Sequence, residues 1–565
     1  MVKRLIIILF ILNYFASVTQ SQNTFDNNHL RELVARQGQA RVIIPMQNTK
    51  TIEELSRNLS ISSVKGETIE IVISPRTIDW FLKQVIKYQI IDGDDSKKII
   101  TASSVNQALG WDVYPTYEQY DSIMQNFIKL YPSLCHLDTI GTTNYGKLVL
   151  ALKISDNADL EEDEPEVFYS STIHGDETGG FILMMRLSDY LLKNYTANAR
   201  IKNLVDNLEI WINPLANPDG TYRTGNSISF PVRNNANDYD LNRNFPDPIT
   251  PGTVKQRETL DMVKFLRNRH FVISANFHSG VEVVNYPWDR WSRLHADDDW
   301  FYNISRKYAD TVHVSAVAGY MDYLDNGITN GYDWYAVYGG RQDFVTYELH
   351  GREVTIELDD NYITPPATLN SLWQYNRRSL LGYIENALYG IHGYVKDSES
   401  LNPVPARIFI TGHDKDSSHV YSDTLTGSFF RFLAPGTYNL LFTAEGYVAK
   451  NVTVVVIEGE KTELNVEMIS FLLPIDTVGT SVLRLVPNPV YDELHVGLPP
   501  SLFGPLRVTI YNMLGLKLRD YYDQGSEDIP LFINVNGLSR GIYSLVITNM
   551  STRISEKGRF VVVRR

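Results

Sequence analysis

The feature that most constrains the fold is a change of hydrophobic pattern along the chain. Between residues 111 and 389, apolar strand-like runs alternate with longer helical segments, which predicts an α/β domain with a mixed central sheet flanked by helices. Residues 390–470 and 484–565 contain short β-rich runs separated by Gly, Pro, Asn and Asp, a pattern typical of small all-β sandwiches. We expect a small α+β domain over residues 22–110 and a linker over residues 471–483. The chain of 565 residues is therefore predicted to be multidomain.

The α+β domain is predicted from four short signals. An apolar run at 40–46 and a β-rich run at 68–74 predict strands. A helical pattern covers residues 51–59, and an amphipathic stretch covers residues 77–91. The predicted order is β-α-β-α.

Composition excludes several classes of protein. The single cysteine, Cys135, cannot form an intramolecular disulfide and rules out a cysteine-rich zinc site. A hydrophobic content of 43% with a net charge of −14 argues for folded domains rather than disorder. The acidic balance and the lack of a long basic run argue against nucleic-acid binding.

The first 21 residues have the pattern of a secretory signal peptide. A basic start, Met1–Arg4, precedes the apolar run Leu5–Phe15, and small and polar residues continue to Ser21. A buried or anchoring N-terminal helix is the alternative. No other uncharged apolar stretch has spanning length, so no transmembrane segment is expected in the mature protein.

Three residues at the ends of two predicted strands are candidate metal ligands. His174 and Glu177 lie in the turn after the run 166–173, and His278 ends the run 271–277. A His and a Glu three residues apart in such a turn can face one metal, and a second His would complete the ligand set of a catalytic zinc. Ligands bind outside the carboxyl ends of strands in open α/β sheets. Taken alone, these residues are better explained by a chance His-x-x-Glu and by a core histidine.

The segment from Arg233 to Pro246, preceded by Asn217-Pro-Asp-Gly220, resembles the signature of the zinc metallocarboxypeptidases, specifically the carboxypeptidase N/E (regulatory) subfamily. The resemblance extends from about Tyr114 to Gly390. The further motifs in family order are His174-x-x-Glu177, Asp240-Leu-Asn-Arg-Asn-Phe-Pro246, His278, Asn285-Tyr-Pro-Trp-Asp289, Ile328-Thr-Asn-Gly-Tyr-Asp-Trp-Tyr335, Gly339-Gly340 and Val354-Thr-Ile-Glu357-Leu358.

The resemblance implies one zinc ion per catalytic domain, held by His174, Glu177 and His278, with water in the open position. It also implies that the carboxylate of Asp240 contacts the first of these histidines, which would fix the imidazole tautomer and raise its basicity.

The same resemblance assigns the catalytic and carboxylate-binding residues. Glu357 matches the general base that acts on zinc-activated water, and Arg233 matches the arginine that stabilises the oxyanion. Asn242 and Arg243 match the clamp for the terminal carboxylate of the substrate. Tyr335 matches the mobile tyrosine that closes over the substrate.

Specificity is predicted from Asp289, which lies where basic-specific members carry the aspartate that receives a C-terminal Arg or Lys. The sequence departs from the subfamily at two positions, since Arg341 replaces a usual methionine and Ser279 a usual glycine. If Arg341 faced the pocket, it would repel a basic substrate side chain.

The flanking regions carry resemblances of their own. Residues 390–470, with Gly390–Asp397 and Ala434–Tyr438, resemble the transthyretin-like sandwich that follows the catalytic domain in this subfamily. Residues 484–565, with Pro487-Asn-Pro489, resemble the sorting domains of bacterial type IX secretion cargo. This implies passage across the outer membrane by the type IX machinery, to the cell surface or the medium; an ordinary adhesive sandwich is the alternative. Residues 22–110 resemble the propeptides that cover the active site in some carboxypeptidases.

The sequence thus predicts a secreted zinc metallocarboxypeptidase that hydrolyses the C-terminal peptide bond of peptides or proteins and releases Lys or Arg. A zinc peptidase or amidase acting on cell-wall peptides is one alternative. A catalytically inactive surface-binding protein is another, and the presence of all three ligands, the base and the clamp argues against it.

Overall fold

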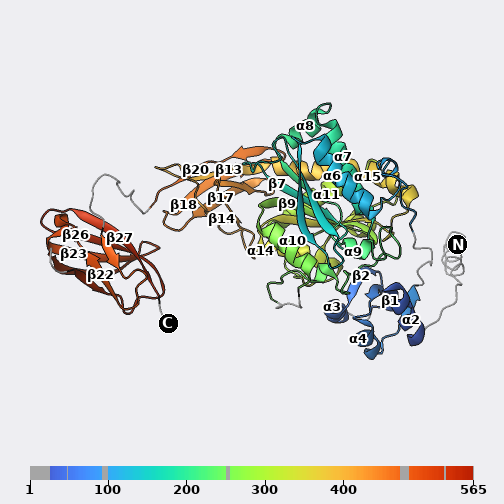
Figure 1. Ribbon diagram of the computed structural model, residues 1–565, viewed down its shortest axis with the longest axis horizontal. Coiled ribbons are helices and arrows are strands. Elements are labelled where there is room, and N and C mark those ends of the chain that lie inside the picture. The colour runs from blue at the N-terminus through green and yellow to red at the C-terminus, as the bar shows by residue number, and fades with distance from the viewer. Residues whose placement is uncertain are drawn as a thin grey trace, which may run out of the picture.

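The computed structural model describes residues 26–46, 49–91, 99–249, 255–470, 483–526 and 530–563 (Figure 1). The predicted signal peptide and all but the last residue of the predicted linker lie outside these residues. A search of the described helices finds none with both the length and the hydrophobicity needed to span a bilayer.

An eight-stranded mixed sheet forms the centre of the α/β region. Its strands are β5 (Cys135–Thr142), β6 (Leu148–Ile154), β7 (Glu166–Ser171), β8 (Glu209–Asn213), β9 (Phe271–His278), β10 (Val281–Tyr286), β11 (Ile328–Asn330) and β12 (Arg352–Asp359), in the spatial order β11-β10-β12-β9-β7-β8-β6-β5. The central strands β8, β7, β9 and β12 are parallel, whereas β6 and β10 run antiparallel to their inner neighbours. The parallel strands are buried on both faces, which explains why they appear in the sequence as continuous apolar runs.

Helices cover both faces of this sheet (Figure 1). The helices of the region are α5 (Val105–Ala108), α6 (Tyr117–Leu130), α7 (Gly179–Asn194), α8 (Ala199–Val205), α9 (Pro218–Thr221), α10 (Arg257–Arg267), α11 (Asp298–His313), α12 (Tyr323–Asn326), α13 (Gly331–Trp334), α14 (Arg341–Glu348) and α15 (Leu369–Glu385), with the 3-10 turns η1 (Leu241–Arg243), η2 (Pro366–Thr368) and η3 (Asn386–Leu388). Along β7, Val167 and Tyr169 join the core formed with α6, α7, α11 and α15, whereas Phe168 joins the core formed with α10 and α14. This alternation is the two-residue period of a strand between two helical layers.

The N-terminal domain is an antiparallel sheet with three helices. Its elements are α2 (Asn27–Gln37), β1 (Ala40–Pro45), α3 (Thr49–Asn58), β2 (Ser60–Lys65), β3 (Thr68–Ile73), α4 (Ile78–Lys83) and β4 (Gln89–Ile91), and the strand order is β2-β3-β1-β4. The predicted elements at 40–46, 51–59 and 68–74 are confirmed within two residues at each end. Its apolar core also includes residues of the α/β region, namely Val281, Val283, Trp334, Tyr335 and Val337.

The expected β-α-β-α order was wrong in two respects. The amphipathic stretch 77–91 is helical only to Lys83, because its last three residues pair with β1 as the edge strand β4 and take their backbone hydrogen bonds there. The prediction also missed α2 and β2. The start of α2 has a recognisable signal, since the Asp26 carboxylate accepts hydrogen bonds from the backbone N–H groups of Asn28 and His29.

The two C-terminal regions are all-β, as expected. The first contains β13 (Gly390–Asp397), β14 (Arg407–Ile410), β15 (Val420–Tyr421), β16 (Ser428–Arg431), β17 (Gly436–Thr443), β18 (Lys450–Val456), β19 (Lys461–Glu463) and β20 (Val466–Met468). The second contains β21 (Arg484–Val486), β22 (Glu493–Gly497), η4 (Pro500–Leu502), β23 (Gly504–Asn512), β24 (Lys517–Gly525), β25 (Leu531–Asn534), β26 (Gly541–Asn549) and β27 (Ser555–Val562). Each forms two sheets around its own hydrophobic core.

A buried ion cluster joins the first of these regions to the eight-stranded sheet. The two carboxylate oxygens of Asp297 accept hydrogen bonds from Arg431, at 2.7 and 2.9 Å, and one of them also accepts from Arg352 of β12 at 2.7 Å. His413 lies 2.7 Å from the other oxygen. The strand that carries Glu357 is thus linked at its start to the β-region 390–470.

Candidate active site

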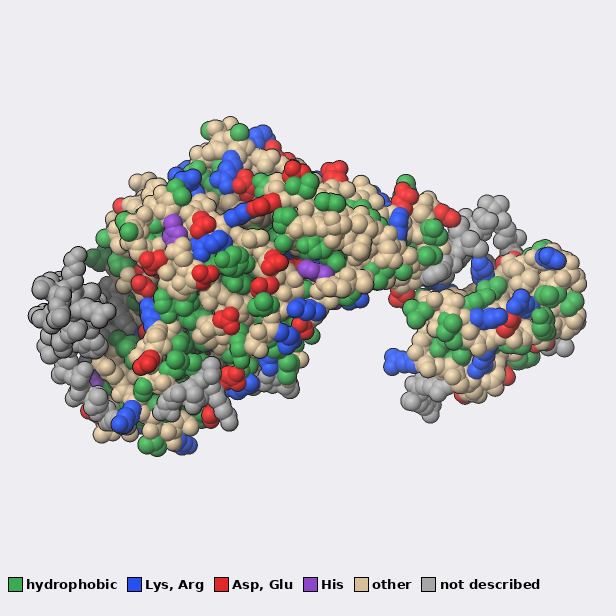
Figure 2. All heavy atoms as spheres, turned by 180° about the vertical axis from the view of Figure 1, so that it is seen from behind, with side chains coloured by type: hydrophobic (Ala, Val, Ile, Leu, Met, Phe, Trp, Pro, Cys, Tyr) green, Lys and Arg blue, Asp and Glu red, His purple; other side chains and the backbone are tan. Residues whose placement is uncertain are grey.

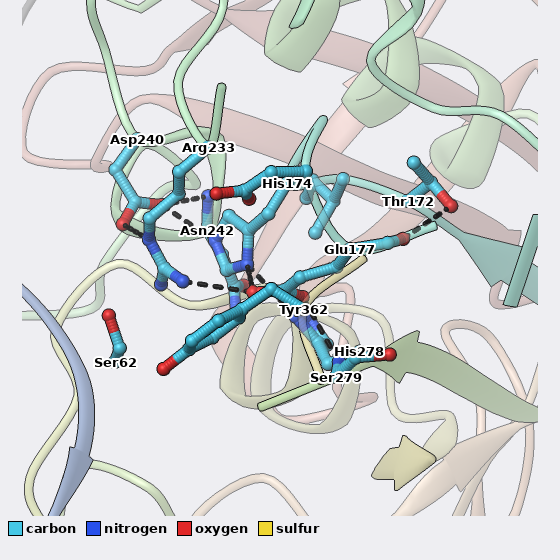
Figure 3. A network of polar contacts seen from close by, with 12 residues as sticks. Ser62, Thr172, His174, Glu177, Arg233, Asp240, Asn242, His278, Ser279 and Tyr362 are labelled. Carbon is cyan, nitrogen blue, oxygen red and sulfur yellow. Dashed lines mark hydrogen bonds and ion pairs between the residues drawn. The ribbon is translucent and has the colours of Figure 1, made fainter. Parts of the chain in front are cut away.

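The turn after β7 carries the first two candidate ligands. Thr172 has a left-handed backbone conformation (φ 59°), which is strained for a β-branched residue and is the kind of strain found at functional sites. Its hydroxyl donates to the carbonyl of Glu177 at 3.0 Å and closes the turn. As a result His174 and Glu177 face each other, with Nδ1 of the histidine 2.8 Å from Oε1 of the glutamate (Figure 3).

The Asn217–Gly220 motif supports this turn. The Asn217 amide donates to the carbonyls of Ile173 and Arg233, both at 3.2 Å. Gly175 and Gly220 pack backbone to backbone, and a Cβ on Gly175 would lie 2.3 Å from the carbonyl carbon of Gly220. Glycine is therefore required where the metal-binding turn meets this motif.

Strand register brings the third candidate ligand and the predicted base together. His278 is the last residue of β9 and pairs in register with Glu357 of the parallel strand β12. Register partners on adjacent strands project to the same face of a sheet. The carboxyl ends of β7, β9 and β12 thus deliver His174, His278 and Glu357 to one place.

The donor atoms fit a zinc ion. Nδ1 of His278 lies 3.0 Å from Nδ1 of His174 and 2.7 Å from Oε2 of Glu177, and donor atoms of the three residues all lie within 4.8 Å of one another. The far nitrogen of each ring has its own partner, Asp240 at 3.0 Å for His174 and Asn276 at 2.7 Å for His278. Two imidazole nitrogens and a carboxylate, held by such outer partners, are the ligand set of catalytic zinc.

The electrostatics of the cluster favour a cation. Burial opposes ionisation of Glu177, but His174 and His278 outweigh it and hold the pKa of this carboxyl well below its usual value. Burial lowers the pKa of His278 to about 4. Burial and Arg233 also act to lower the pKa of His174, yet Glu177 and Asp240 raise it overall. The protein thus stabilises positive charge at His174, in the place where a metal would supply it.

Arg233 and Asp240 frame the other side of the site (Figure 3). The Arg233 guanidinium donates to Oε1 of Glu177 at 3.0 Å and to Oδ2 of Asp240 at 2.9 Å. The second oxygen of Asp240 contacts His174 and accepts from the backbone N–H of Asn242 at 2.9 Å. Arg233 is therefore a fixed cation beside the candidate metal ligands.

Glu357 is a buried carboxylate with an unused oxygen. It is 8% exposed, and its Oε2 atom has no hydrogen-bond partner among the described residues. Burial and the negative charge of Glu177 raise its pKa well above the usual value. A carboxylate held in this way is suited to taking up a proton.

Asn242 and Arg243 project from η1, directly after Asp240. The Asn242 side-chain oxygen accepts from the backbone N–H of Arg341 at 2.9 Å. Nη1 of Arg243 donates to the Asn242 carbonyl at 3.0 Å, whereas its buried Nε has no partner within the described chain. A guanidinium with a free buried donor is suited to receiving a carboxylate.

Asp289 is almost fully buried, 4% exposed, and lies next to this clamp. Its Oδ1 accepts hydrogen bonds from the amides of Asn285 and Gln342, both at 2.9 Å. The space beside it is kept open by glycine, since a Cβ on Gly331 would lie 2.0 Å from Oδ1. A Cβ on Gly340 would lie 3.7 Å from both Oδ2 of Asp289 and Oδ1 of Asn242, so the two side chains flank one position.

Arg341 is fully buried, and its guanidinium pairs with Glu353 at 3.0 Å. The cation that could have repelled a basic substrate therefore has a carboxylate partner of its own.

The N-terminal domain lies across the clamp and Tyr335. Nη2 of Arg243 donates to the carbonyl of Ile61 in β2 at 3.2 Å, and the Tyr335 hydroxyl lies 3.5 Å from the same oxygen. Trp334 donates to the carbonyl of Val64 at 3.2 Å. Tyr335 is consequently 8% exposed, and burial raises its pKa to about 12.

The same domain also contacts the metal-binding turn. The side chains of Gln39 and Arg41 donate to Asp176, the neighbour of Glu177, at 2.8 and 2.7 Å. The Arg41 guanidinium lies 3.3 Å from the centre of the Tyr362 ring. The figure places Ser62 of β2 close to this network (Figure 3).

The structure brings together all ten predicted site residues, but sequence reasoning missed several of their partners. Gln342 and Asn285 lie inside motifs already recognised, so their contact with Asp289 had a local signal. Glu353 and Ile61 had none, because their partners lie 12 and 182 residues away in the chain.

Parts of the chain match known protein families and known proteins. Residues 120–379 match the family model described as zinc carboxypeptidase, and residues 484–562 match the secretion system C-terminal sorting domain. Carboxypeptidase D of Homo sapiens is 33% identical over 363 residues, which cover 60% of this chain and 26% of that protein. The catalytic chain of carboxypeptidase N of Rattus norvegicus is 34% identical over 387 residues, which cover 60% of this chain and 83% of that protein.

Among solved structures, carboxypeptidase A from Helicoverpa armigera has a TM-score of 0.51 at 18% identity, covering 62% of this chain and 97% of that one, and it supports the fold alone. The sorting-domain match indicates export through the secretion system to the cell surface or beyond it. The chain spans about a quarter of carboxypeptidase D but most of the carboxypeptidase N chain. Together with the candidate metal site, these matches identify the chain as a member of the zinc carboxypeptidase family with a C-terminal secretion sorting domain.

Proposed function

We propose that the protein is a secreted zinc carboxypeptidase that removes C-terminal Lys or Arg from peptides and proteins. The observation that carries the specificity is Asp289, a buried carboxylate beside the predicted carboxylate clamp. Among the described residues, the hydrogen bonds to its side chain come from the neutral amides of Asn285 and Gln342. A side chain entering from the clamp would meet a negative charge with an oxygen, Oδ2, directed toward Gly340. Such a carboxylate selects a guanidinium or an ammonium group.

The chemistry follows from the residues around the candidate metal site. A zinc ion held by His174, Glu177 and His278 would supply a Lewis acid that polarises a carbonyl and lowers the pKa of water. Glu357 takes a proton from the attacking water and returns it to the leaving amine. Arg233, a permanent cation here, stabilises the negative charge that develops on the scissile carbonyl oxygen.

Exopeptidase action depends on recognising the free chain end. The unused Nε of Arg243 and the amide nitrogen of Asn242 are the groups we assign to the terminal carboxylate. Because this clamp and Asp289 flank Gly340, a substrate bound by both would present its last peptide bond to Glu357.

The acidic character relevant to specificity is local. On the face shown in Figure 2, acidic and basic side chains are interspersed rather than gathered by sign. The formal charge of −14 therefore gives that face no broad negative patch, and we assign selection to Asp289 itself.

Peptides that differ only in the C-terminal residue test this function. We expect kcat/KM for Arg or Lys to exceed that for Ala by on the order of 100-fold, because the site's buried charge stays unpaired with a neutral side chain. C-terminally amidated peptides are the matched control and should not be cleaved. A preference for Ala or Leu would refute the role of Asp289, and cleavage of cell-wall peptides alone would favour the alternative substrate class.

We further infer that residues 22–110 form an inhibitory prodomain. Its β2 strand offers the Ile61 carbonyl to Arg243 and Tyr335, the groups assigned to substrate binding. Arg41 adds a buried ion pair with Asp176 at 2.7 Å, so the domain is fixed by charge as well as by its shared apolar core. A substrate carboxylate would have to displace Ile61 from the clamp.

Controlled cleavage tests this inference. Residues 92–98 are replaced by the recognition sequence of a specific protease, and activity is measured before and after cutting. We expect activity to rise about tenfold or more after cutting, because the fraction of enzyme with a free substrate site limits the apparent affinity for substrate. The natural sequence treated with the same protease is the control. Equal activity before and after cleavage would exclude an inhibitory role.

We assign residues 1–21 to a signal peptide and residues 484–565 to type IX sorting, so that the enzyme crosses the outer membrane. The transthyretin-like region 390–470 stabilises the catalytic domain through Asp297. Deleting residues 484–565 should retain active enzyme inside the cell envelope. Normal release of the shortened protein into the medium would contradict this assignment.

A further inference from the structure

Three consecutive residues at the start of α14 connect the two halves of the proposed substrate site. The backbone N–H of Arg341 donates to the side chain of Asn242 at 2.9 Å, and the Gln342 amide donates to Asp289 at 2.9 Å. The Asp343 carboxylate accepts from the backbone N–H of Asp289 at 3.0 Å. The position of this segment therefore sets the distance between the clamp and the selecting carboxylate.

The side chain of Arg341 anchors the segment to the central sheet. Its Nε and Nη2 lie 3.0 Å from the two oxygens of Glu353, a bidentate ion pair in which both side chains are 0% exposed. Ser274 donates to the same carboxylate at 2.7 Å, so Glu353 is itself fixed. The N-cap of the helix is Gly340, which has no side chain to cap the first turn.

We propose that the buried Arg341–Glu353 ion pair is a positioning device that holds Gln342 and Asn242 against the substrate and so sets selectivity for a basic C-terminal residue. The inference rests on the proposed Lys/Arg specificity. Arg341 and Glu353 act through Gln342 and Asn242, and neither of them is assigned a contact with the substrate.

The pair also balances charge near Asp289. Burial raises the pKa of Asp289 to about 6, Arg243 acts to lower it, and the negative charge of Glu353 adds to the rise. Nη2 of Arg341 lies 3.0 Å from Oε2 of Glu353, so its positive charge compensates the charge of Glu353. The ionisable groups that interact with Asp289 come from η1, α14, β12 and the end of α13, and they are Arg243, Asp343, Glu353, Glu357 and Tyr335.

The test compares Arg341→Met, which restores the residue usual in the subfamily, with Glu353→Gln. Both variants are made in the full-length chain that carries the protease site at residues 92–98. They are loaded with zinc and cleaved at that site before the assay. We expect each to lower the ratio of kcat/KM for C-terminal Arg over Ala by about tenfold, mainly through KM, with kcat for the Ala peptide within about threefold. Arg341→Met should also move the acidic limb of the Arg-peptide pH profile to higher pH, because Glu353 then acts unopposed.

The double variant Arg341→Met/Glu353→Gln keeps the test valid if a lone buried charge prevents folding. It buries no unpaired charge, so it should return the acidic limb to the wild-type position while the selectivity ratio stays low. Glu209→Gln, which breaks the buried Lys153–Glu209 pair elsewhere in the sheet, is the matched control and should lower Tm without moving either readout.

The outcomes separate the two hypotheses. In one outcome, the wild-type enzyme prefers Arg while Arg341→Met keeps the wild-type kcat/KM ratio or the wild-type acidic limb. That result overturns the positioning role and leaves the proposed function intact. A wild-type enzyme without any basic preference refutes the proposed specificity, and the inference with it.

Discussion

Among the residues that the structure describes, two clusters combine acids with histidines at metal-binding distances, one around Glu177 and one around Asp297. By geometry alone they are similar, because His174, Glu177 and His278 have donor atoms within 4.8 Å of one another, and so do Asp297, His413 and Asp414. In the second cluster, the guanidinium groups of Arg352 and Arg431 donate to the carboxylate of Asp297. Arg431 also donates to Oδ1 of Asp414.

The first cluster differs in its charge balance. Arg233 contacts one oxygen of Glu177, but the other oxygen faces Nδ1 of His278, and Oε2 of Glu357 has no partner within the described chain. Burying carboxylates without cations is costly. An excess of buried carboxylates is therefore typical of a site that binds a cation and a substrate. The balanced cluster instead joins two domains. Proximity of ligand-type residues is thus insufficient to identify a metal site. The contacts of the neighbouring arginines distinguish the two clusters.

Zinc removal tests this contrast with the largest expected effect. Chelation should lower activity by at least about 10³-fold, since the Lewis acid is lost, and zinc should restore it. Metal analysis should find one zinc per chain. His278→Gln should lose that zinc, whereas Asp297→Asn should retain it; two zinc ions per chain, or chelator-resistant activity, would break the comparison.

Glu357→Gln should lower kcat by roughly 10²–10⁴-fold, because the amide cannot carry the proton. Zinc content and Tm should stay close to wild type, since Oε2 has no partner to lose. Kinetics on an Arg-ending peptide and metal analysis give the answer. A variant with full turnover would remove Glu357 as general base.

Asp297→Asn should destabilise the fold by roughly 3–5 kcal/mol, because Arg352 and Arg431 would be left buried without their carboxylate. The change should appear as a lower Tm in thermal unfolding, while kcat and KM of the folded enzyme stay the same. A fall in kcat at unchanged Tm would instead make the cluster part of the catalytic machinery.

Asp289 is intermediate between the two clusters, because its side chain accepts from amides and contacts no guanidinium within the part of the chain that the structure describes. It predicts the smallest effect. Its pKa is raised to about 6, mainly by burial, so it is ionised above that pH and neutral below it. A neutral group cannot hold a cation, so kcat/KM for Arg-ending peptides should fall as pH drops through about 6. Ala-ending peptides and the Asp289→Asn variant should lack this limb, and an identical limb in all three would assign it elsewhere.

Much of the site could be predicted from the sequence because its residues stand at strand ends and in short motifs. His174 and His278 follow apolar runs, and parallel strands present their carboxyl ends at one edge. The fold class followed from the same runs. The helix expected over 77–91 failed because its last residues are decided by pairing with β1, a contact that local pattern does not encode.

Arg341 shows the limit most clearly. The sequence left open whether Arg341 faces the pocket, because the direction of its side chain depends on Glu353, which lies on a different element. Likewise, the contact of Ile61 with Arg243 joins residues far apart in the chain.

The sequence by itself indicated the family and the candidate metal ligands through its motifs, and the strands that carry them through residue type and local periodicity. Only the tertiary structure decided which charges neutralise each other, that Arg341 turns to Glu353, and that the N-terminal domain contacts Arg243 and Tyr335. Electrostatic interactions depend on distance and burial, and both are set by contacts between segments that are distant in the chain.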